Sequence, residues 1–588
     1  MKFEQVLMLG VAALAVSACG SSEPETTATT TTTTESAVTE PDTDVTEVSS
    51  ITIPELPALP AISETQFRDY MQTLAADEFE GRAPATAGGR KTVDWLEARM
   101  QEMGLKPANG DSYRQDVPLV EITLIPQESN FAITTANGES AVLPYRQESV
   151  YWTKRVVEDV SFENSEMVFV GYGVVAPEYG WNDYEGIDVT GKTVVMLVND
   201  PGYATQNPDL FNGNSMTYYG RWTYKYEEAA RQGATAAIVV HQTAPAAYGW
   251  GVVEGSWSGP QLDLERPDGG ENRVALEGWI QESVAERLFV DAGLDFAQAQ
   301  KDALSPDFQA VPMTGLSASG KIKNNINRNA SQNVAGYIEG ATKPDEYILY
   351  MAHWDHLGRT FAPIGGGSGS GDTISNGAVD NATGTSGILN IAQSFVDAEK
   401  QPERSILFVA VTAEESGLLG SAYYAEDPLV PFNKTVGGIN IDAMLSGGES
   451  RDITVIGYGA SELEDLLKTA ADKRGMYLRP DPEPEKGYFY RSDHVSLAKK
   501  GVPMLYSKNG IDLVVGGEPA GEAISENYRA NLYHKPADEY SEDWEVGGIM
   551  ATLEILRDVG GYMAYSDIQP NWYDGNEFRA LRDEQMGN

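Results

Sequence analysis

The chain has 588 residues, of which 41% are hydrophobic, and its 87 acidic and 42 basic residues give a formal net charge of -45. This length exceeds what one hydrophobic core usually supports, so two or more domains are expected. Nucleic acid is excluded as a partner, because so acidic a surface repels a polyanion. The simplest interpretation of the acidic excess is a solvated, solubilising surface.

Residues 1–19 have the pattern of an export signal. Lys2 precedes an apolar run over 6–16 that is too short to span a bilayer as a permanent helix. The tetrapeptide VSAC over 16–19 resembles the bacterial lipobox, which implies cleavage before Cys19 and a lipid on its sulfur. An ordinary signal peptide with a coincidental cysteine is the alternative.

Cys19 is also the only cysteine in the chain. If it carries a lipid, the mature protein has no thiol and therefore no disulfide. We expect an exported lipoprotein, held through its lipid at the periplasmic face of a membrane, the outer membrane or the cell surface.

Residues 20–60 are rich in Ser, Thr, Glu and Pro, a composition that predicts a disordered tether because it cannot form a core. The next segment, 61–120, contains two predicted helices, in which apolar residues recur at helical spacing around Phe67 and around Val93. A Gly/Pro/Ala loop with the sequence EGRAPATAGG separates them.

Residues 121–330 have a different texture, with short β-type runs separated by turns and one helical stretch, YKYEEAARQGA. We expect a separate, mainly β module here. Its single histidine, His241, ends an apolar strand, and a structural role is the better explanation for it.

From residue 331 to 588, apolar strands alternate with helices. This alternation predicts an α/β fold in which a mixed, largely parallel sheet lies between helices. Loops at the carboxyl ends of the strands of such a sheet lie together, so polar residues that follow the strands should converge.

Residue types that bind metals follow these strands in order. Imidazole and carboxylate groups without a thiolate are typical of a hydrolytic zinc ion, or a similar divalent ion, that keeps open positions. The set is too large for one such ion, and two ions that share a carboxylate fit it better. The candidate ligands, in chain order, are His353, Asp355, Asp380, Glu414, Glu415, Asp442 and His534.

Two of these motifs have simpler explanations when taken alone. Asp355 can hold the imidazole of His353 two residues earlier, but a buried hydrogen-bonded pair would show the same spacing. Asp380 lies in a Gly/Asn/Ser-rich loop, where an Asx turn or helix cap is the alternative. Glu414 and Glu415 are adjacent and cannot face one ion alike, so one can ligate while the other serves as general base.

Taken together, these residues resemble the M28 family of metallopeptidases, which contains zinc aminopeptidases and relatives of glutamate carboxypeptidase. The likeness extends from about residue 64 to 570. It implies that 331–588 form a catalytic metallopeptidase domain with 61–120 as its N-terminal part. It also implies that 121–330 are an inserted protease-associated (PA) domain, most clearly in GYGVVAPEYGWNDYEGIDVTGKTVVML.

The resemblance also implies how two Zn²⁺ ions would be held. One ion would take His353 and Asp442 as ligands, the other would take Glu415 and His534, and Asp380 would bridge them.

Catalytic roles follow from the same resemblance. Glu414 matches the glutamate that takes the proton from the attacking water, and Asp355 supports the first histidine. Tyr533 precedes the last histidine, where a tyrosine can steady the oxyanion. Arg491 and His494 are candidates for the substrate pocket, and a structural role for His494 is equally compatible with the sequence.

The expected activity is release of N-terminal residues from peptides. A site dense in carboxylates attracts a peptide amine and repels a peptide carboxylate. A carboxypeptidase of the same family is an alternative, because Arg491 could bind the free carboxylate of a peptide C-terminus. Further alternatives are a one-zinc enzyme similar to glutaminyl cyclase and a receptor-like surface protein without catalysis. The sequence sets no oligomeric state and no role for His356.

Overall fold

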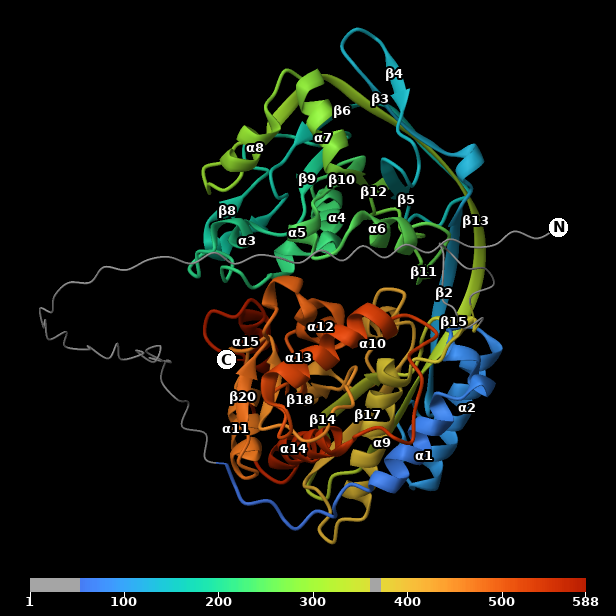
Figure 1. The fold of residues 1–588 in the computed structure, drawn as a ribbon, viewed down its shortest axis with the longest axis vertical. Coiled ribbons are helices and arrows are strands. Elements are labelled where there is room, and N and C mark those ends of the chain that lie inside the picture. The colour runs from blue at the N-terminus through green and yellow to red at the C-terminus, as the bar shows by residue number, and fades with distance from the viewer. Residues whose placement is uncertain (1–52, 360–371, 588) are drawn as a thin grey trace, which may run out of the picture. The chain divides into compact units, whose positions relative to one another are not determined.

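The structure, a computed structural model, describes residues 53–359 and 372–587. Its strands belong mainly to two sheets that share one long strand (Figure 1). The strands of the first sheet are β1 (Lys106–Pro107), β2 (Arg114–Leu124), β11 (Pro260–Leu264), β13 (Val311–Ile338), β14 (Lys343–His353), β17 (Arg404–Val411), β18 (Thr435–Asn440), β19 (Asp452–Ile456), β20 (Tyr477–Pro480) and β21 (Met504–Asn509).

The centre of the first sheet is parallel. β17, β14, β18 and β21 are neighbours in that order and run in one direction. β13 continues the sheet antiparallel beside β17, and β19 continues it antiparallel beside β21. The sheet is therefore mixed and largely parallel at its centre.

Helices cover both faces of the first sheet. They are α1 (Glu64–Leu74), α2 (Ala87–Glu102), α9 (Thr383–Val396), α10 (Leu419–Glu426), α11 (Leu463–Asp472), α12 (His494–Ala498), α13 (Gly517–Asn527), α14 (Gly547–Ala564) and α15 (Arg579–Met586). Alternate residues of β14 serve opposite faces: Ile348 and Tyr350 lie in the core with α1, α2, α9 and α14, whereas Leu349 and Met351 lie in the core with α10 and α12. The predicted α/β fold class is confirmed.

The two predicted N-terminal helices are α1 and α2. Phe67 and Met71 of α1 and Val93 of α2 are buried in the core, as their spacing predicts. Each helix has a side-chain cap, because the hydroxyl of Ser63 accepts from a main-chain N–H of α1 and that of Thr86 does so for α2.

The packed chain begins before the predicted end of the tether. Leu56 and Leu59 lie against the core of α1, α9 and α14. The carbonyl of Pro60 accepts hydrogen bonds from Ser394 Oγ at 2.7 Å and from Arg557 Nη1 at 2.6 Å. The predicted signal peptide, Cys19 and most of the predicted tether lie outside the described residues.

The second sheet belongs to the middle of the chain. Besides β13 it contains β3 (Asn130–Thr134), β4 (Ser140–Val142), β5 (Ser149–Trp152), β6 (Asp159–Phe169), β9 (Thr193–Leu197), β10 (Ala236–His241) and β12 (Leu276–Gln281). β12, β10, β9 and β6 are parallel neighbours in that order.

This middle part contains more helix than the sequence pattern predicts. α4 (Trp222–Arg231) covers the expected helical stretch, and α6 (Trp250–Ser256), α7 (Glu282–Asp291) and α8 (Phe296–Asp302) are added to it. α7 buries Val284, Leu288 and Phe289 at helical spacing, a short signal within a segment rich in strands.

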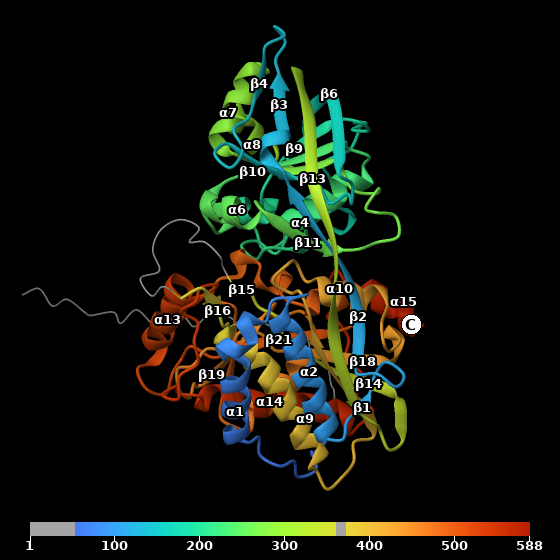
Figure 2. The same cartoon turned by 90° about the vertical axis from the view of Figure 1, so that its right-hand side faces the viewer.

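β13 is the element common to both sheets. Its 28 residues pair with β6 and β3 in the second sheet and with β2 and β17 in the first. Figures 1 and 2 both show it running without interruption from one sheet to the other.

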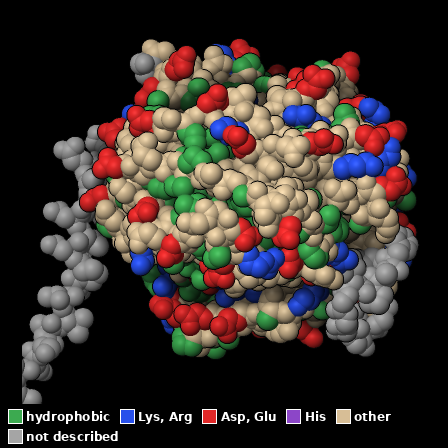
Figure 3. Space-filling model, turned by 90° about the horizontal axis from the view of Figure 1, so that it is seen from above, with side chains coloured by type: hydrophobic (Ala, Val, Ile, Leu, Met, Phe, Trp, Pro, Cys, Tyr) green, Lys and Arg blue, Asp and Glu red, His purple; other side chains and the backbone are tan. Residues whose placement is uncertain are grey.

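Charge is spread over the face of the molecule drawn in Figure 3. On the face drawn in Figure 3, Asp and Glu side chains are scattered among fewer Lys and Arg rather than gathered in one patch. None of the helices in the described ranges combines the length and apolarity needed to span a membrane.

Candidate metal centre

The candidate ligands come from the carboxyl ends of neighbouring strands. His353 is the last residue of β14, Glu415 follows β17 and Asp442 follows β18. Asp380 lies in the turn that leads into α9, and His534 follows the turn over 528–532. Because β14, β17 and β18 are parallel, these loops open at one edge of the sheet.

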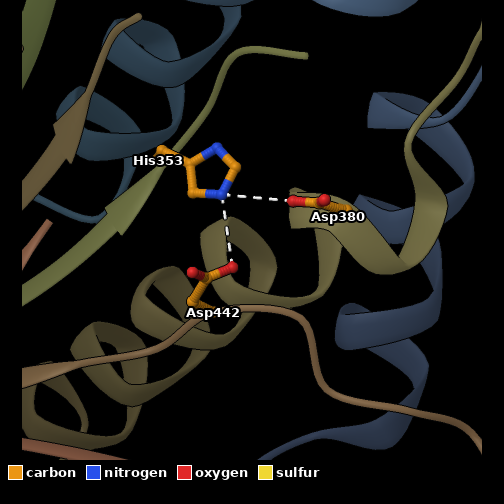
Figure 4. A group of neighbouring side chains, drawn as sticks. All are labelled: His353, Asp380 and Asp442. Atoms are coloured by element: carbon orange, nitrogen blue, oxygen red, sulfur yellow. Dashed lines mark hydrogen bonds and ion pairs between the residues drawn. The ribbon is translucent and has the colours of Figure 1, made fainter. Parts of the chain in front are cut away.

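The first donor group consists of His353, Asp380 and Asp442. Nε2 of His353 lies 3.3 Å from Oδ1 of Asp380 and 3.3 Å from Oδ1 of Asp442 (Figure 4). One ligand atom from each residue lies within 4.8 Å of the others. All three residues are buried, so this group can hold one divalent ion.

The second donor group shares Asp380 with the first. Nε2 of His534 lies 3.4 Å from Oδ2 of Asp380 and 3.0 Å from Oε2 of Glu415. Asp380 thus turns one carboxylate oxygen toward His353 and the other toward His534. This is the geometry that a carboxylate between two ions requires.

His356 also belongs to the second group. Its Nδ1 lies 2.5 Å from Oε1 of Glu415, and His356, Asp380 and Glu415 together offer ligand atoms within 4.8 Å of one another. Its Nε2 is buried and has no hydrogen-bond partner among the described residues. Glu415 is therefore held between two histidines, His356 and His534. The only sequence signal for this contact is the position of His356 directly after His353-Trp354-Asp355.

Charges within the centre set the protonation of its members. Burial opposes ionisation of Glu415, but His534 and His356 outweigh burial and bring the pKa of Glu415 down to about 2. Burial lowers the pKa of His534, whereas Glu415 and Asp380 raise it to about 10. Burial also lowers the pKa of His353, but the charge of Glu414 and the hydrogen bond to Asp380 raise it well above its usual value. Ionised carboxylates are the form that binds metal.

Glu414, unlike Glu415, belongs to neither donor group. Its main-chain N–H donates to Oδ1 of Asp355 at 3.1 Å. Burial raises the pKa of Glu414 well above its usual value. The positive charge of His353 lowers this pKa, but the negative charges of Glu415 and Asp442 add to the rise. A carboxylate with a raised pKa is the stronger base.

Asp355 supports His353 less directly than its spacing predicts. The main-chain oxygen of Asp355 lies 3.2 Å from Nδ1 of His353, whereas its carboxylate oxygen Oδ1 lies 3.8 Å away. The carboxylate of Asp355 instead accepts from the main chain of Glu414, because the loop after β14 turns it toward the loop after β17.

Two further residues hold the ligands in place. Ser492 Oγ donates to Oδ2 of Asp442 at 2.6 Å. The carboxylate of Asp538 accepts from the main-chain N–H of Val379 at 3.0 Å and of Asp380 at 3.2 Å. Both are supports of the kind that fixes ligand orientation. Ser492 lies 50 residues from Asp442 and Asp538 lies 158 residues from Asp380, so neither contact has a local sequence signal.

The remaining predicted site residues have distinct surroundings. Tyr533 stacks on His534 with ring centroids 3.8 Å apart and is 45% exposed. His494 is fully buried between Phe489 and Tyr506, and burial lowers its pKa to about 3. It faces the core, which favours the structural role. Arg491 precedes Ser492 and is half-buried.

Arg82, from the EGRAPATAGG loop, ties together the two loops that bear the first ligands. Its guanidinium donates to the carbonyls of Trp354 at 2.9 Å, Asn376 at 2.6 Å and Gly377 at 2.8 Å, and also to that of Leu74. Burial lowers the pKa of Arg82 to about 10, and Asp538, Asp355 and Asp380 limit the fall. The loop therefore supplies a buried cation beside the carboxylate cluster.

Comparisons with known proteins agree with this site. Residues 333–556 match the sequence model described as "Peptidase family M28". "Aminopeptidase NAALADL1" of Mus musculus is 32% identical over 148 residues, 24% of this chain and 17% of that protein. "Leucine aminopeptidase 2" of Trichophyton equinum is 26% identical over 254 residues, 40% of this chain and 48% of that protein.

Among solved structures, "Aminopeptidase from Aneurinibacillus sp. strain AM-1" has a TM-score of 0.47 at 19% identity, covering 86% of this chain and 94% of that chain. The chain spans about a sixth to a half of the length of these two curated relatives.

Removal of Arg82 should loosen the metal centre. Arg82→Met leaves four main-chain carbonyls without their donor, so the free energy of unfolding should fall by about 2–4 kcal/mol in urea titrations with chelator present. Zinc affinity, measured by competition with a chromophoric chelator, should fall at least about tenfold because the loops of His353 and Asp380 lose their common anchor.

Arg90→Met is the matched control, since Arg90 is exposed and makes one main-chain hydrogen bond at the start of α2. Equal behaviour of the Arg82 and Arg90 variants would refute the anchoring role.

The match to peptidase family M28 and the donor groups coincide in the chain: residues 333–556, which contain every histidine and carboxylate of the two groups, are similar to M28 peptidases.

Proposed function

We propose that the protein is a two-zinc exopeptidase that releases N-terminal residues from peptides. The observation that carries this proposal is the orientation of Asp380, whose two carboxylate oxygens face the two donor groups. The M28 match of the same segment and the relatives described as aminopeptidases support it.

The donor set suits zinc. Imidazole and carboxylate ligands in a buried site without thiolate are those of hydrolytic zinc centres, and the two groups have room for two ions. His353 and Asp442 would hold one ion, Glu415 and His534 the other, and Asp380 both. When bound, the ions polarise the scissile carbonyl and lower the pKa of the attacking water.

The chain itself moves the proton. Glu414 stands beside the donor groups without joining either, and its raised pKa suits it to accept a proton from water and pass it to the leaving amine. Tyr533, stacked on His534, can donate a hydrogen bond to the oxyanion.

The negative charge of the site favours an amine-end substrate. The carboxylates of the two groups and Glu414 attract a protonated peptide N-terminus. A carboxypeptidase is the second candidate, because the Arg491 guanidinium has no carboxylate partner among the described residues. The one-zinc alternative is disfavoured because it would leave one donor group unused, and the receptor-like alternative is disfavoured because it would leave both without a catalytic role.

The finer architecture belongs to the proposal as well. We propose that the segment around the second sheet is a PA-like domain, and that Cys19 carries the lipid that anchors the protein to a membrane. The sequence stretches that resemble a PA domain and a lipobox support these two statements.

Metal content tests the central claim. The purified chain should contain two divalent ions by elemental analysis, and chelation should abolish peptide hydrolysis until zinc is restored. Full activity with one ion or none would refute the two-ion centre.

Substitution of the adjacent glutamates separates their roles. Glu414→Gln should keep both ions and lose about 10² to 10⁴ in kcat, as expected for loss of a general base. Glu415→Gln should instead lower zinc affinity, because Glu415 faces His534 and His356. Near-normal turnover by Glu414→Gln would show that the roles are wrongly assigned.

Blocked peptides decide between the two ends of the substrate. N-acetylation should abolish cleavage of a peptide, and C-terminal amidation should leave it cleavable, because the amine is the group that the acidic site recognises. The opposite pattern, measured by mass spectrometry of the products, would identify a carboxypeptidase.

Fractionation tests the anchor. The protein should partition with membranes and carry a modified Cys19, whereas Cys19→Ser should be released or remain unprocessed. Unmodified Cys19 in a membrane-bound protein would contradict the lipid anchor.

A further inference from the structure

Two arginines near the metal centre lack the carboxylate partners that are abundant elsewhere in this chain. Arg221 directly precedes α4, beside the second sheet, and Arg491 ends the turn over 488–491, beside the first. Nε of Arg221 and both Nε and Nη2 of Arg491 are buried and have no hydrogen-bond partner among the described residues. With 87 acidic residues in the chain, this lack of a partner needs an explanation.

Other buried arginines show what is usual here. Arg404 donates to Glu346 at 2.6 Å and to two main-chain carbonyls, and Arg82 donates to four carbonyls. A buried guanidinium without acceptors loses the hydrogen bonds that it makes in water and gains none in return.

Aromatic rings flank the guanidinium of Arg491. It lies over the ring of Tyr248 at 6.0 Å and over that of Tyr488 at 5.6 Å. The ring of Tyr490, in the same turn, lies 6.0 Å from that of Tyr218, which is three residues before Arg221, so the two segments that carry the arginines are in contact. The rings hold the Arg491 guanidinium without offering its N–H groups a carbonyl or carboxylate acceptor.

The two cations also act on each other. Burial, and next to it the charge of Arg491, lower the pKa of Arg221 to about 9. Two like charges that act on each other in a poorly solvated place are unfavourable, and an anion that contacts both guanidinium groups would remove the repulsion and supply the missing acceptors.

This pair adjoins the metal centre. Arg491 is followed by Ser492, whose hydroxyl donates to Asp442. The turn that carries Arg491 is therefore tied to the first donor group, and a peptide bound at the metal centre would lie close to this turn.

We infer that Arg221 and Arg491 form a carboxylate-binding subsite that holds an anionic group of the peptide substrate. The inference rests on the proposed peptidase function and narrows its substrates. The carboxylate has two sources, the free C-terminus of a short peptide or the side chain of an acidic residue after the scissile bond. Both present the same two oxygens to a guanidinium.

Two matched substrate pairs test the subsite and separate the sources. Leu-Ala and Leu-Ala-amide differ only in the α-carboxylate, and Leu-Asp-amide and Leu-Asn-amide differ only in the side-chain charge. In the wild-type chain, kcat/KM should be about tenfold or more higher for the charged member of at least one pair, the size of a charge-assisted hydrogen bond. The pair that shows the preference identifies the source.

Substitutions assign the preference to the two residues. Arg221→Gln and Arg491→Gln should each bring the ratio of kcat/KM close to one, and Arg491→Lys should retain part of it because lysine keeps the charge without the fork. Arg287→Gln is the control, since Arg287 is an exposed arginine of α7 paired with Glu148. It should leave the ratio at its wild-type value.

A binding measurement keeps the test independent of turnover. Calorimetry on the Glu414→Gln chain should show tighter binding of the charged member of the preferred pair, and Arg221→Gln in that background should remove the difference. Cleavage of all four peptides without preference overturns the subsite and leaves the peptidase proposal standing. Cleavage of none of them, with equal binding of charged and neutral members, overturns both.

Discussion

The concentration of carboxylates at the ends of three parallel strands is the constraint on which the rest of the site depends. Asp355, Asp380 and Asp442 are buried there, with Glu414 and Glu415 beside them. Carboxylates so close in a poorly solvated place repel one another and need cations. The imidazoles supply part of the positive charge that these carboxylates need, and the buried guanidinium of Arg82 supplies another part. The proposed zinc ions would supply the remainder.

The convergence of three candidate ligands was predictable because its signal is local. His353, Glu415 and Asp442 end or follow apolar strands, and parallel strands bring their carboxyl ends together whatever the loops between them. The alternation of strands and helices after residue 331 predicted the α/β fold class, because this pattern too is local in the sequence. For His353, Asp380 and Asp442 the order along the chain was enough to predict the neighbourhood that the structure shows.

The supporting contacts were not predictable, because their partners lie far apart in sequence. Arg82 reaches carbonyls more than 270 residues away, and Asp538 accepts from a turn 158 residues earlier. His356 belongs to the first sequence motif, but its contact with Glu415 depends on the conformation of the loop after β14, which the sequence does not show. The same conformation turns the Asp355 carboxylate from His353 toward Glu414, which residue spacing alone does not reveal.

The chain passes between the two sheets at β2, β11 and β13, and these three strands pair with one another side by side. β2 leads out of the first sheet and β13 returns to it, and the two pair antiparallel over Arg114–Leu124 and Asn324–Val334. A paired ribbon has fewer accessible backbone conformations than a loop, because its ladder hydrogen bonds fix the backbone angles. The ribbon, together with contacts such as Lys499 Nζ to Glu227 Oε1 at 3.7 Å, therefore limits how far Arg221 and Arg491 can move apart, and the proposed subsite would be largely formed before an anionic substrate arrives.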